Sequence, residues 1–249
     1  MSITIKSERE IATMRQAGRI VAAVLRELSK QLRSGMITRE LDMIAVKVSE
    51  ELGAKPSFRG YRGFPASLCV SVNDEIVHGI PSERILYEGD IVSLDFGVIF
   101  KGFQGDAALT VGVGKISQQA KRLIETAEGA LRAGIVTAHP EARLGDVSAT
   151  IQDYVESRHF SIVREYTGHG IGREMHEEPQ IPNFGLPGTG PVLKRGMTLA
   201  LEPMVNAGSW STRTGNDHWT VYTADGNLSA HFEHTIAITG AEPEVLTAF

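Results

Sequence analysis

Four carboxylates stand inside apolar stretches of the chain, where an acid is unexpected. Asp95 lies within IVSLDFGVIF, Asp106 within FQGDAALT, Glu202 within LALEPM and Glu233 within AHFEHT. An ionised carboxylate left unpaired in such surroundings costs on the order of several kcal/mol. Any one of these acids could be salt-bridged or could cap a neighbouring loop, but lysine and arginine are scarce around them. Together the four acids predict a cluster that holds divalent cations.

The spacing of Asp95 and Asp106 predicts that their side chains converge. If the chain turns near Phe100 and Lys101, residue i opposes residue 201 − i, and Asp95 lies directly opposite Asp106 in two antiparallel strands. Directly opposed residues have Cβ atoms about 5 Å apart. Two carboxylates at that separation repel each other, so we expect a cation between them.

The stretch YTGHGIGREMHEEP, residues 166–179, carries His169 and His176 among closely spaced glycines. It is not the G-x-G-x-x-G phosphate loop, because Arg173 replaces the last glycine and Pro179 follows too soon for a helix. Nor is it the H-E-x-x-H zinc helix, since histidines seven residues apart in extended chain lie roughly 23 Å apart. If both act, they have different roles. As a ligand, His169 would favour a transition metal over calcium or magnesium, although a lone histidine is more often structural.

Helices and apolar strands must position these side chains. A capping box at Ser7 and Glu10 predicts the start of a long amphipathic helix, and a second helix is expected to end at Gly53. Apolar residues at helical spacing over 123–131 and 147–155 predict another pair of helices. The stretches GDIVSLDFGVIF, GMTLALEPMV and LSAHFEHTIAIT are predicted to be buried strands, because they are apolar and β-branched.

The order helix, helix, strands occurs twice along the chain. GDIVSLDFGV overlays GMTLALEPMV at a constant shift of 107, which places Asp95 and Glu202 at the same position. Two buried strands can resemble each other by chance, but chance does not predict an acid in each. We interpret the pattern as an internal duplication. It predicts an α+β fold of two pseudo-symmetric halves, roughly residues 1–115 and 116–249, with a shared antiparallel sheet and flanking helices in a single catalytic domain, 1–249.

The composition excludes several classes of protein. The chain has 249 residues, of which 42% are hydrophobic and 22% charged, as in an ordinary globular protein. A net charge of −5 with scattered basic residues excludes a dedicated nucleic-acid binder. No apolar stretch reaches the length of a membrane span, and MSITIKSERE lacks the apolar run of a signal peptide. The single cysteine, Cys69, excludes an internal disulfide and predicts a cytoplasmic location.

With these residues assembled, the sequence resembles the type I methionine aminopeptidases, within the pita-bread metallopeptidases of family M24, over essentially its whole length. The resemblance rests on VNDEIVHGIP, on LDFG and FQGDAALT, and on YTGHGIGREMHEEP, LALEPM and FEHT. It implies the duplicated pita-bread fold. It also implies a hydrolase that removes the N-terminal methionine from nascent proteins and peptides when the second residue is small.

The same resemblance implies two divalent metal ions and their ligands. Asp95 holds one metal in a bidentate way, His169 and Glu202 hold the other, and Asp106 and Glu233 serve both. The sequence leaves the choice among Mn²⁺, Fe²⁺, Co²⁺ and Zn²⁺ open, because all of them accept oxygen-rich sites with one imidazole.

Catalysis is assigned by the resemblance to His78, His176 and Glu202. His176 is expected to bind the scissile carbonyl, and His78 the amide that becomes the leaving amine; the alternative is that both are plain surface histidines. The resemblance implies a methionine pocket built from Phe58, Tyr61, Phe64, Cys69, Met175 and Trp219, with His78 and His176 completing the substrate-binding set. The alternative is that the six pocket residues are ordinary core packing.

The chain departs from the family pattern at three pocket positions and at one residue near the last predicted ligand. Phe58 stands where a cysteine is found, Phe64 where tyrosine is common, Met175 where phenylalanine may stand and His231 where glutamine is usual. Because His231 lies two residues before Glu233, we expect it to lie near the metal centre. There it could add an ionisation to the pH profile of kcat/KM, unless it has no kinetic role.

Other readings of the sequence stay open at this point. Prolidases and Xaa-Pro aminopeptidases share the fold and the ligands but carry an additional N-terminal domain, and type II methionine aminopeptidases carry a helical insertion near the last ligands. The chain could also be a binding protein that kept the fold and lost the chemistry. As partners we expect the N-termini of nascent polypeptides, and we expect the protein to be a monomer. A transient contact with ribosomes is left open. We expect neither membrane binding nor specific recognition of nucleic acid.

Overall fold

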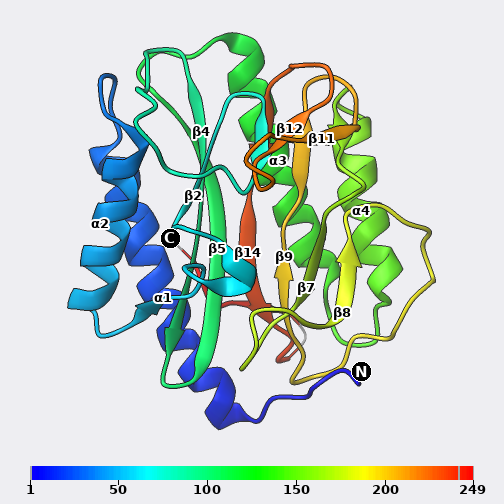
Figure 1. The fold of residues 1–249 in the computed structure, drawn as a ribbon. Helices are drawn as coiled ribbons and strands as arrows, with labels where there is room; N and C mark the ends of the chain where they lie inside the picture. The colour runs from blue at the N-terminus through cyan, green and yellow to red at the C-terminus, as the bar shows by residue number, and fades with distance from the viewer. Residues whose placement is uncertain (1, 241, 249) are drawn as a thin grey trace.

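The computed structural model describes residues 2–240 and 242–248, and Figure 1 shows a central sheet with helices packed against it. The helices are α1 (Glu8–Gln31), α2 (Thr38–Glu51), α3 (Gln118–Thr137) and α4 (Leu144–Glu156), and a 3₁₀ turn spans Tyr61–Gly63. The strands are β1 (Lys55–Pro56), β2 (Cys69–Val72), β3 (Glu75–Val77), β4 (Ile91–Phe100), β5 (Phe103–Gly112), β6 (Ser161–Ile162), β7 (Thr167–Gly170), β8 (Glu177–Pro182), β9 (Thr198–Leu201), β10 (Met204–Asn206), β11 (Thr212–Thr214), β12 (Val221–Thr223), β13 (Ser229–His231), β14 (Glu233–Ala237) and β15 (Glu244–Val245).

The helices form where the sequence predicts them. Ser7 caps α1 with its side chain, and Glu10 completes the predicted capping box by accepting from the Ser7 backbone N–H at 2.9 Å. α2 ends two residues before Gly53, whose φ of +76° fits a helix C-terminus. None of the helices in the described part of the chain is both long and apolar enough to cross a membrane.

The main sheet lines up the strands that carry the predicted acids. Within the described residues it has nine strands, and its central path runs β1, β4, β5, β14, β9, β7, β8. All of these pairings are antiparallel. α1 packs against β4 and β5, while α3 contacts β5, β9 and β14, so the helices cover one face of the sheet (Figure 1). The four predicted metal-binding acids lie on the opposite face.

The predicted register of the β4–β5 hairpin is wrong by two residues. The turn consists of Lys101 and Gly102, with φ of +49° and +78°, so Phe100 pairs with Phe103 and residue i opposes 203 − i. This turn lies one residue later in the chain than the one expected, and positive φ at both positions matches the twist of the flanking strands. Asp106 therefore pairs with Gly97 and lies diagonal to Asp95, on the same face.

Two further strands were predicted as continuous and are each divided in the structure. The segment from Gly196 splits into β9 and β10 at Glu202 and Pro203, and the last long strand splits into β13 and β14 at Phe232. Proline removes a ladder donor at the first break. β10 and β13 pair with each other in a separate small sheet with β6. Both breaks lie directly beside predicted metal ligands.

Candidate active site

Five predicted ligands lie on five neighbouring strands of the main sheet. The strands β4, β5, β14, β9 and β7 carry Asp95, Asp106, Glu233, Glu202 and His169 respectively, with Glu202 immediately after the last residue of β9. Antiparallel neighbours lie about 4.8 Å apart, so side chains on one face of such strands converge.

Small residues separate the ligands along the sheet. Ala108 pairs with Asp95 on one side and with Glu233 on the other. Ala200 likewise pairs with His169. The short side chains leave space above the sheet between the acids, where ions can be held.

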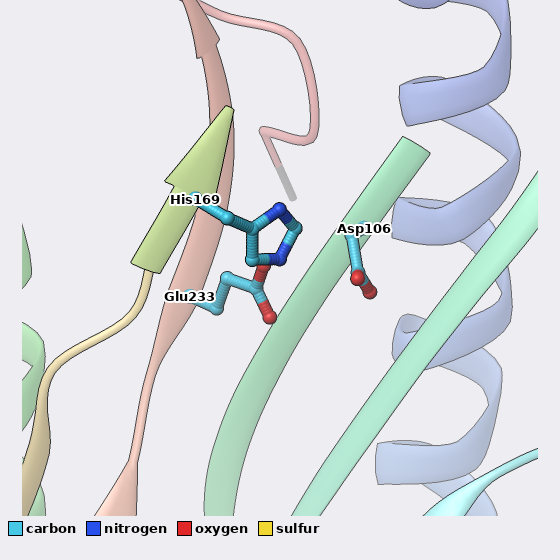
Figure 2. A group of neighbouring side chains, drawn as sticks. All are labelled: Asp106, His169 and Glu233. Carbon is cyan, nitrogen blue, oxygen red and sulfur yellow. The ribbon is translucent and has the colours of Figure 1, made fainter. Parts of the chain in front are cut away.

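The inner group consists of Asp106, His169 and Glu233 (Figure 2). Each offers one ligand atom, and these atoms all lie within 4.8 Å of one another. Nε2 of His169 also lies 3.5 Å from a carboxylate oxygen of Glu202. All three side chains of the inner group are buried.

The acids lack the partners that buried carboxylates normally have. One oxygen each of Asp95, Asp106 and Glu233 is buried without a hydrogen-bond partner among the described residues. Burial raises the pKa of Asp95 to about 7, although the Cys69 thiol acts in the opposite direction. Burial and neighbouring acids also raise the pKa values of Asp106, Glu202 and Glu233 well above the ordinary range. Bound cations would relieve both penalties, so this donor set fits divalent metals.

His169 is prepared to act as a neutral ligand. Its Nδ1 lies 2.9 Å from the carbonyl oxygen of Gly170, which can only accept, so the proton is on Nδ1 and Nε2 faces the acids with a lone pair. Burial lowers the pKa of His169 to about 4, which keeps the ring neutral. Its position among Asp106, Glu202 and Glu233 is compatible with the expected role as a ligand.

His176 lies against His169 and is oriented by Tyr61. Its ring centroid is 4.2 Å from that of His169, and the Tyr61 ring stacks on it at 5.4 Å. The Tyr61 hydroxyl lies 2.8 Å from Nδ1 of His176. Partial burial, and then the neighbouring His169, lower the pKa of His176 to about 3. It therefore carries a single ring proton.

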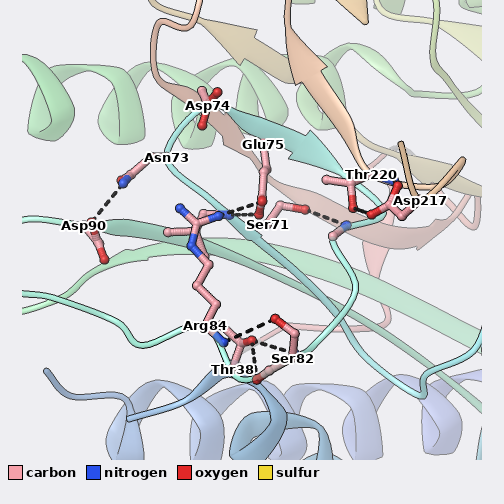
Figure 3. Close-up of polar contacts among 12 residues, drawn as sticks. Thr38, Ser71, Asn73, Asp74, Glu75, Ser82, Arg84, Asp90, Asp217 and Thr220 are labelled. Atoms are coloured by element: carbon pink, nitrogen blue, oxygen red, sulfur yellow. Dashed lines mark hydrogen bonds and ion pairs between the residues drawn. The ribbon is translucent and has the colours of Figure 1, made fainter. Parts of the chain in front are cut away.

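A polar network fixes the loops that carry His78 and Trp219 (Figure 3). Asp217 accepts from the backbone N–H groups of Trp219 and Thr220, each at 2.9 Å. The Ser71 hydroxyl accepts from the N–H of Gly79 at 3.1 Å, beside His78.

Glu75 anchors the same region. It accepts from the N–H of Val72 at 2.7 Å and from the Arg84 guanidinium at 2.6 Å. His78 itself has a φ of +60°, which is uncommon for a residue with a side chain. Its backbone conformation is thus held by the contacts around it.

One cavity of about 160 Å³ brings the predicted side chains together. This is several times the ~30 Å³ of a water molecule and well below the ~300 Å³ of pockets for drug-sized ligands. All predicted ligands, both catalytic histidines and the whole predicted methionine pocket line it: Phe58, Tyr61, Phe64, Cys69, His78, Asp95, Asp106, His169, Met175, His176, Glu202, Trp219 and Glu233.

Arg62 lines the cavity, and Gly97 lies against residues that line it; neither was predicted from the sequence. A Cβ at Gly97 would lie 2.9 Å from Phe58 and 3.1 Å from Met175, so only glycine keeps the floor open. Arg62 lines the cavity from an exposed position next to Tyr61. The sequence did indicate Arg62, since it stands within Gly-Tyr-Arg-Gly beside the predicted pocket residue Tyr61. It was not predicted because the pocket was expected to consist of apolar residues.

His231 lies where its spacing predicts, but its proposed ionisation is not supported. Its Nε2 is 3.8 Å from a carboxylate oxygen of Glu202, and the side chain is 1% exposed. Burial, and then His78, lower the pKa of His231 to about 3. The expected extra ionisation between pH 5.5 and 8.5 is therefore wrong for this residue, because desolvation outweighs the nearby acids.

The loop that carries Met175 and His176 is tied to the N-terminal segment. Lys6 Nζ lies 2.5 Å from Glu177, whose other oxygen accepts from the backbone N–H of Arg173 at 2.9 Å. The side chains of Lys6 and Glu177 are only 3% and 13% exposed. Figure 1 shows the segment before α1 running to the side of the sheet that holds β7 and β8.

Comparison with known proteins gives concordant matches over the whole chain. The model of metallopeptidase family M24 matches residues 12–240. The chain is 53% identical over 245 residues to methionine aminopeptidase 1 of Bacillus subtilis (strain 168), covering 98% of this chain and 99% of the relative. It is 53% identical to the methionine aminopeptidase of Clostridium perfringens, with 98% of each chain covered.

Solved structures agree with these matches. The crystal structure of a methionine aminopeptidase from Thermotoga maritima has a TM-score of 0.98 at 46% identity and covers 100% of both chains. Prolidase from Pyrococcus furiosus has a TM-score of 0.79 at 21% identity, and the match spans 98% of this chain but 65% of the prolidase. The pita-bread fold expected from the sequence is thereby confirmed.

Proposed function

The chain belongs to metallopeptidase family M24 and, within it, to the methionine aminopeptidases, and from this premise we propose how its cavity removes an N-terminal methionine. The proposal is carried by one observation. Five metal-ligating side chains and an apolar pocket for one side chain line the same cavity.

Two divalent metals would be held by the acids and the inner histidine. We assign Asp95 to one metal, His169 and Glu202 to the other, and Asp106 and Glu233 to both. When bound, such metals lower the pKa of a water and polarise the scissile carbonyl. The donor set of four carboxylates and one imidazole fits Mn²⁺, Fe²⁺, Co²⁺ or Zn²⁺.

His176 donates a hydrogen bond to the scissile carbonyl oxygen. The ring is neutral and has one N–H. If the Tyr61 hydroxyl donates to Nδ1, the proton is on Nε2 and is available to the oxygen as negative charge develops there. In that arrangement the Tyr61 hydroxyl stabilises the tautomer that we propose catalysis requires.

Glu202 and His78 complete the proton and substrate contacts. With cations bound the Glu202 carboxylate stays ionised, and we assign it to accept a proton from the attacking water and pass it to the leaving amine. His78 is half-buried, on the cavity wall, and burial lowers the pKa of its imidazole. A neutral His78 can contact the amide nitrogen that leaves.

The methionine side chain enters between Phe58, Phe64 and Trp219, with Met175 and Cys69 behind. The Phe64 and Trp219 rings meet edge to face, with centroids 5.2 Å apart. The cavity size favours one unbranched apolar side chain. Crowding by the strands and metals favours a small second residue.

Two experiments test this function. Metal analysis of protein purified without added salts should find about two divalent metal ions per protein chain. Met-Ala-Ser should then be hydrolysed far faster than Leu-Ala-Ser, Met-Lys-Ser or Met-Pro-Ser. Metal-free protein that hydrolyses none of them would favour the alternative of a binding protein, and faster cleavage at a Met-Pro bond would favour an Xaa-Pro peptidase.

We also propose that its substrates are the N-termini of nascent polypeptides. The enzyme is proposed to be a cytoplasmic monomer, and the single cysteine supports the cytoplasmic location. It is organised as two pseudo-symmetric halves, roughly 1–115 and 116–249, and the two successive helix pairs support this division. Transient docking to ribosomes would bring the cavity to these substrates, and co-sedimentation with translating ribosomes measures it.

A further inference from the structure

Arg62 is a cationic side chain at the mouth of the cavity that the proposed function gives no role. Among the described residues that line the cavity, no other is a lysine or an arginine. It is exposed, and no carboxylate in the described part of the chain lies within ion-pair distance of its guanidinium. The contact that it makes is with the Tyr61 ring, whose centroid is 5.4 Å from Cζ.

The backbone holds Arg62 in this position. Its φ of +50° lies in the left-handed region, which side chains rarely occupy, between Gly60 and Gly63, whose φ values are also positive. The tight loop is closed by a hydrogen bond from Gly60 N–H to the Phe64 carbonyl at 2.8 Å. An exposed arginine is therefore directed to the rim by a fixed turn rather than by a flexible loop.

Arg62 lies next to the reacting groups without being one of them. Tyr61 separates it from His176, and its charge contributes, after burial and His169, to the low pKa of His176. A substrate whose first residue fills the pocket and whose first peptide bond faces His176 must leave the cavity along this rim. The residues that follow the second one pass the guanidinium.

The charge at this rim is set by Arg62 once metals are bound. The four carboxylates carry four negative charges, and two divalent cations neutralise them. The guanidinium, which stays protonated at any working pH, then dominates the local field.

We propose that Arg62 selects among methionine-initiated chains by charge, favouring an acidic residue at the third position and disfavouring lysine or arginine there. The inference rests on the proposed function, since it concerns the path of the same substrate. Exposed ion pairs are weak, so we expect a ratio of kcat/KM of about three to ten between acidic and basic peptides at low salt.

The test uses the metal-loaded full chain and three C-terminally amidated peptides, Met-Ala-Asp-Ser, Met-Ala-Gln-Ser and Met-Ala-Lys-Ser. Amidation removes the terminal carboxylate, which could otherwise bind Arg62. The variants are Arg62→Gln, which removes the charge, and Arg62→Lys, which keeps it. Arg59→Gln is the matched control, because Arg59 is an exposed arginine three residues away that does not line the cavity.

We expect the Asp-to-Lys ratio to fall to about one in Arg62→Gln and in 0.5 M NaCl, and to persist in Arg62→Lys and Arg59→Gln. Each variant is compared across its own three peptides, so a general loss of activity cancels. A wild-type ratio of one, or an unchanged ratio in Arg62→Gln, overturns the proposal. If wild type fails to cleave even the Gln peptide, the proposed function itself is wrong.

Discussion

At the scale of single residues, Asp106 is the most sensitive position of the metal centre. Asp106→Asn keeps the shape of the side chain but removes a negative charge that we assign to both metals. We expect metal content to fall and kcat to drop by at least about 100-fold, because the neutral amide replaces a carboxylate whose charge holds the ions. Metal analysis and steady-state kinetics on Met-Ala-Ser measure both.

The control for this substitution is Asp153→Asn on the exposed face of α4, which should change neither quantity. Near wild-type turnover with two metals in Asp106→Asn would show that Asp106 is not a shared ligand.

A second residue-scale prediction concerns Tyr61. Tyr61→Phe keeps the ring that stacks on His176 but removes the hydroxyl 2.8 Å from Nδ1. The tautomer of His176 is then unselected, so kcat should fall about three- to tenfold while KM changes little. Tyr87→Phe, at an exposed tyrosine outside the cavity, serves as the control. An effect on KM alone would mean that Tyr61 only packs against the substrate.

At the scale of elements, the Lys6–Glu177 ion pair should hold the loop that carries Met175 and His176. Lys6→Met leaves a buried carboxylate unpaired, which costs about 3–5 kcal/mol. We expect a clear fall in Tm together with a rise in KM. Arg195→Gln breaks an exposed pair with Glu8 and should be nearly silent.

Adding Glu177→Gln to Lys6→Met separates stability from positioning. The double variant no longer buries an unpaired charge, so Tm should recover in part. KM should remain raised, because the loop has lost its anchor. Recovery of both quantities together would indicate that the ion pair acts only on stability.

The elements also show what the sequence could predict. Asp95 and Glu233 stood out as candidate ligands because an acid within an apolar strand needs an unusual explanation. The hairpin register did not, since nothing in the sequence distinguishes a turn at Lys101 and Gly102 from one at Phe100 and Lys101, one residue earlier. A register error of two residues preserves the face of every side chain, and for that reason the predicted acids still lie on one face of the sheet.

Contacts between distant segments were beyond the sequence. Lys6 and Glu177 are 171 residues apart and match no local pattern. The breaks at Pro203 and Phe232 depend on pairing with a second sheet, which hydrophobic periodicity does not reveal. The full burial of His231 also depends on such contacts, and it lowers the pKa of the ring below the range where an extra ionisation was expected.

At the scale of the whole molecule, metal removal should make stability depend on pH. In the metal-free protein the pKa of Asp95 is raised from 3.8 to about 7, so the folded state binds more protons than the unfolded state between these values. The buried His169, His176 and His231 have the opposite effect below the ordinary histidine pKa of about 6.5, because burial lowers their pKa values. Above that pH the raised acids dominate, so stability is lost as pH rises. We expect the Tm in EDTA to fall by more than about 5 °C from pH 6.5 to pH 8.

Saturating metal should abolish this loss, because the bound cations stabilise the ionised acids. Differential scanning calorimetry of the same protein with EDTA or with Mn²⁺ provides the comparison. A metal-free Tm that is constant or rises between pH 6.5 and pH 8 would contradict the assignment of these acids as a desolvated cluster.

The division of two strands at the metal ligands links the choice of ion to the choice of substrate. At Glu202 the chain passes from β9 in the main sheet to β10 in the small sheet, and near Glu233 it passes from β13 to β14. Met204 of β10 packs with Val77 and Val221, next to His78 and near Trp219. The proposed ligands Glu202 and Glu233 therefore lie where the chain passes between the main sheet and the small sheet. An ion of different radius held there would move one sheet against the other, so we predict that the choice of metal alters both side-chain selectivity and the fit of inhibitors.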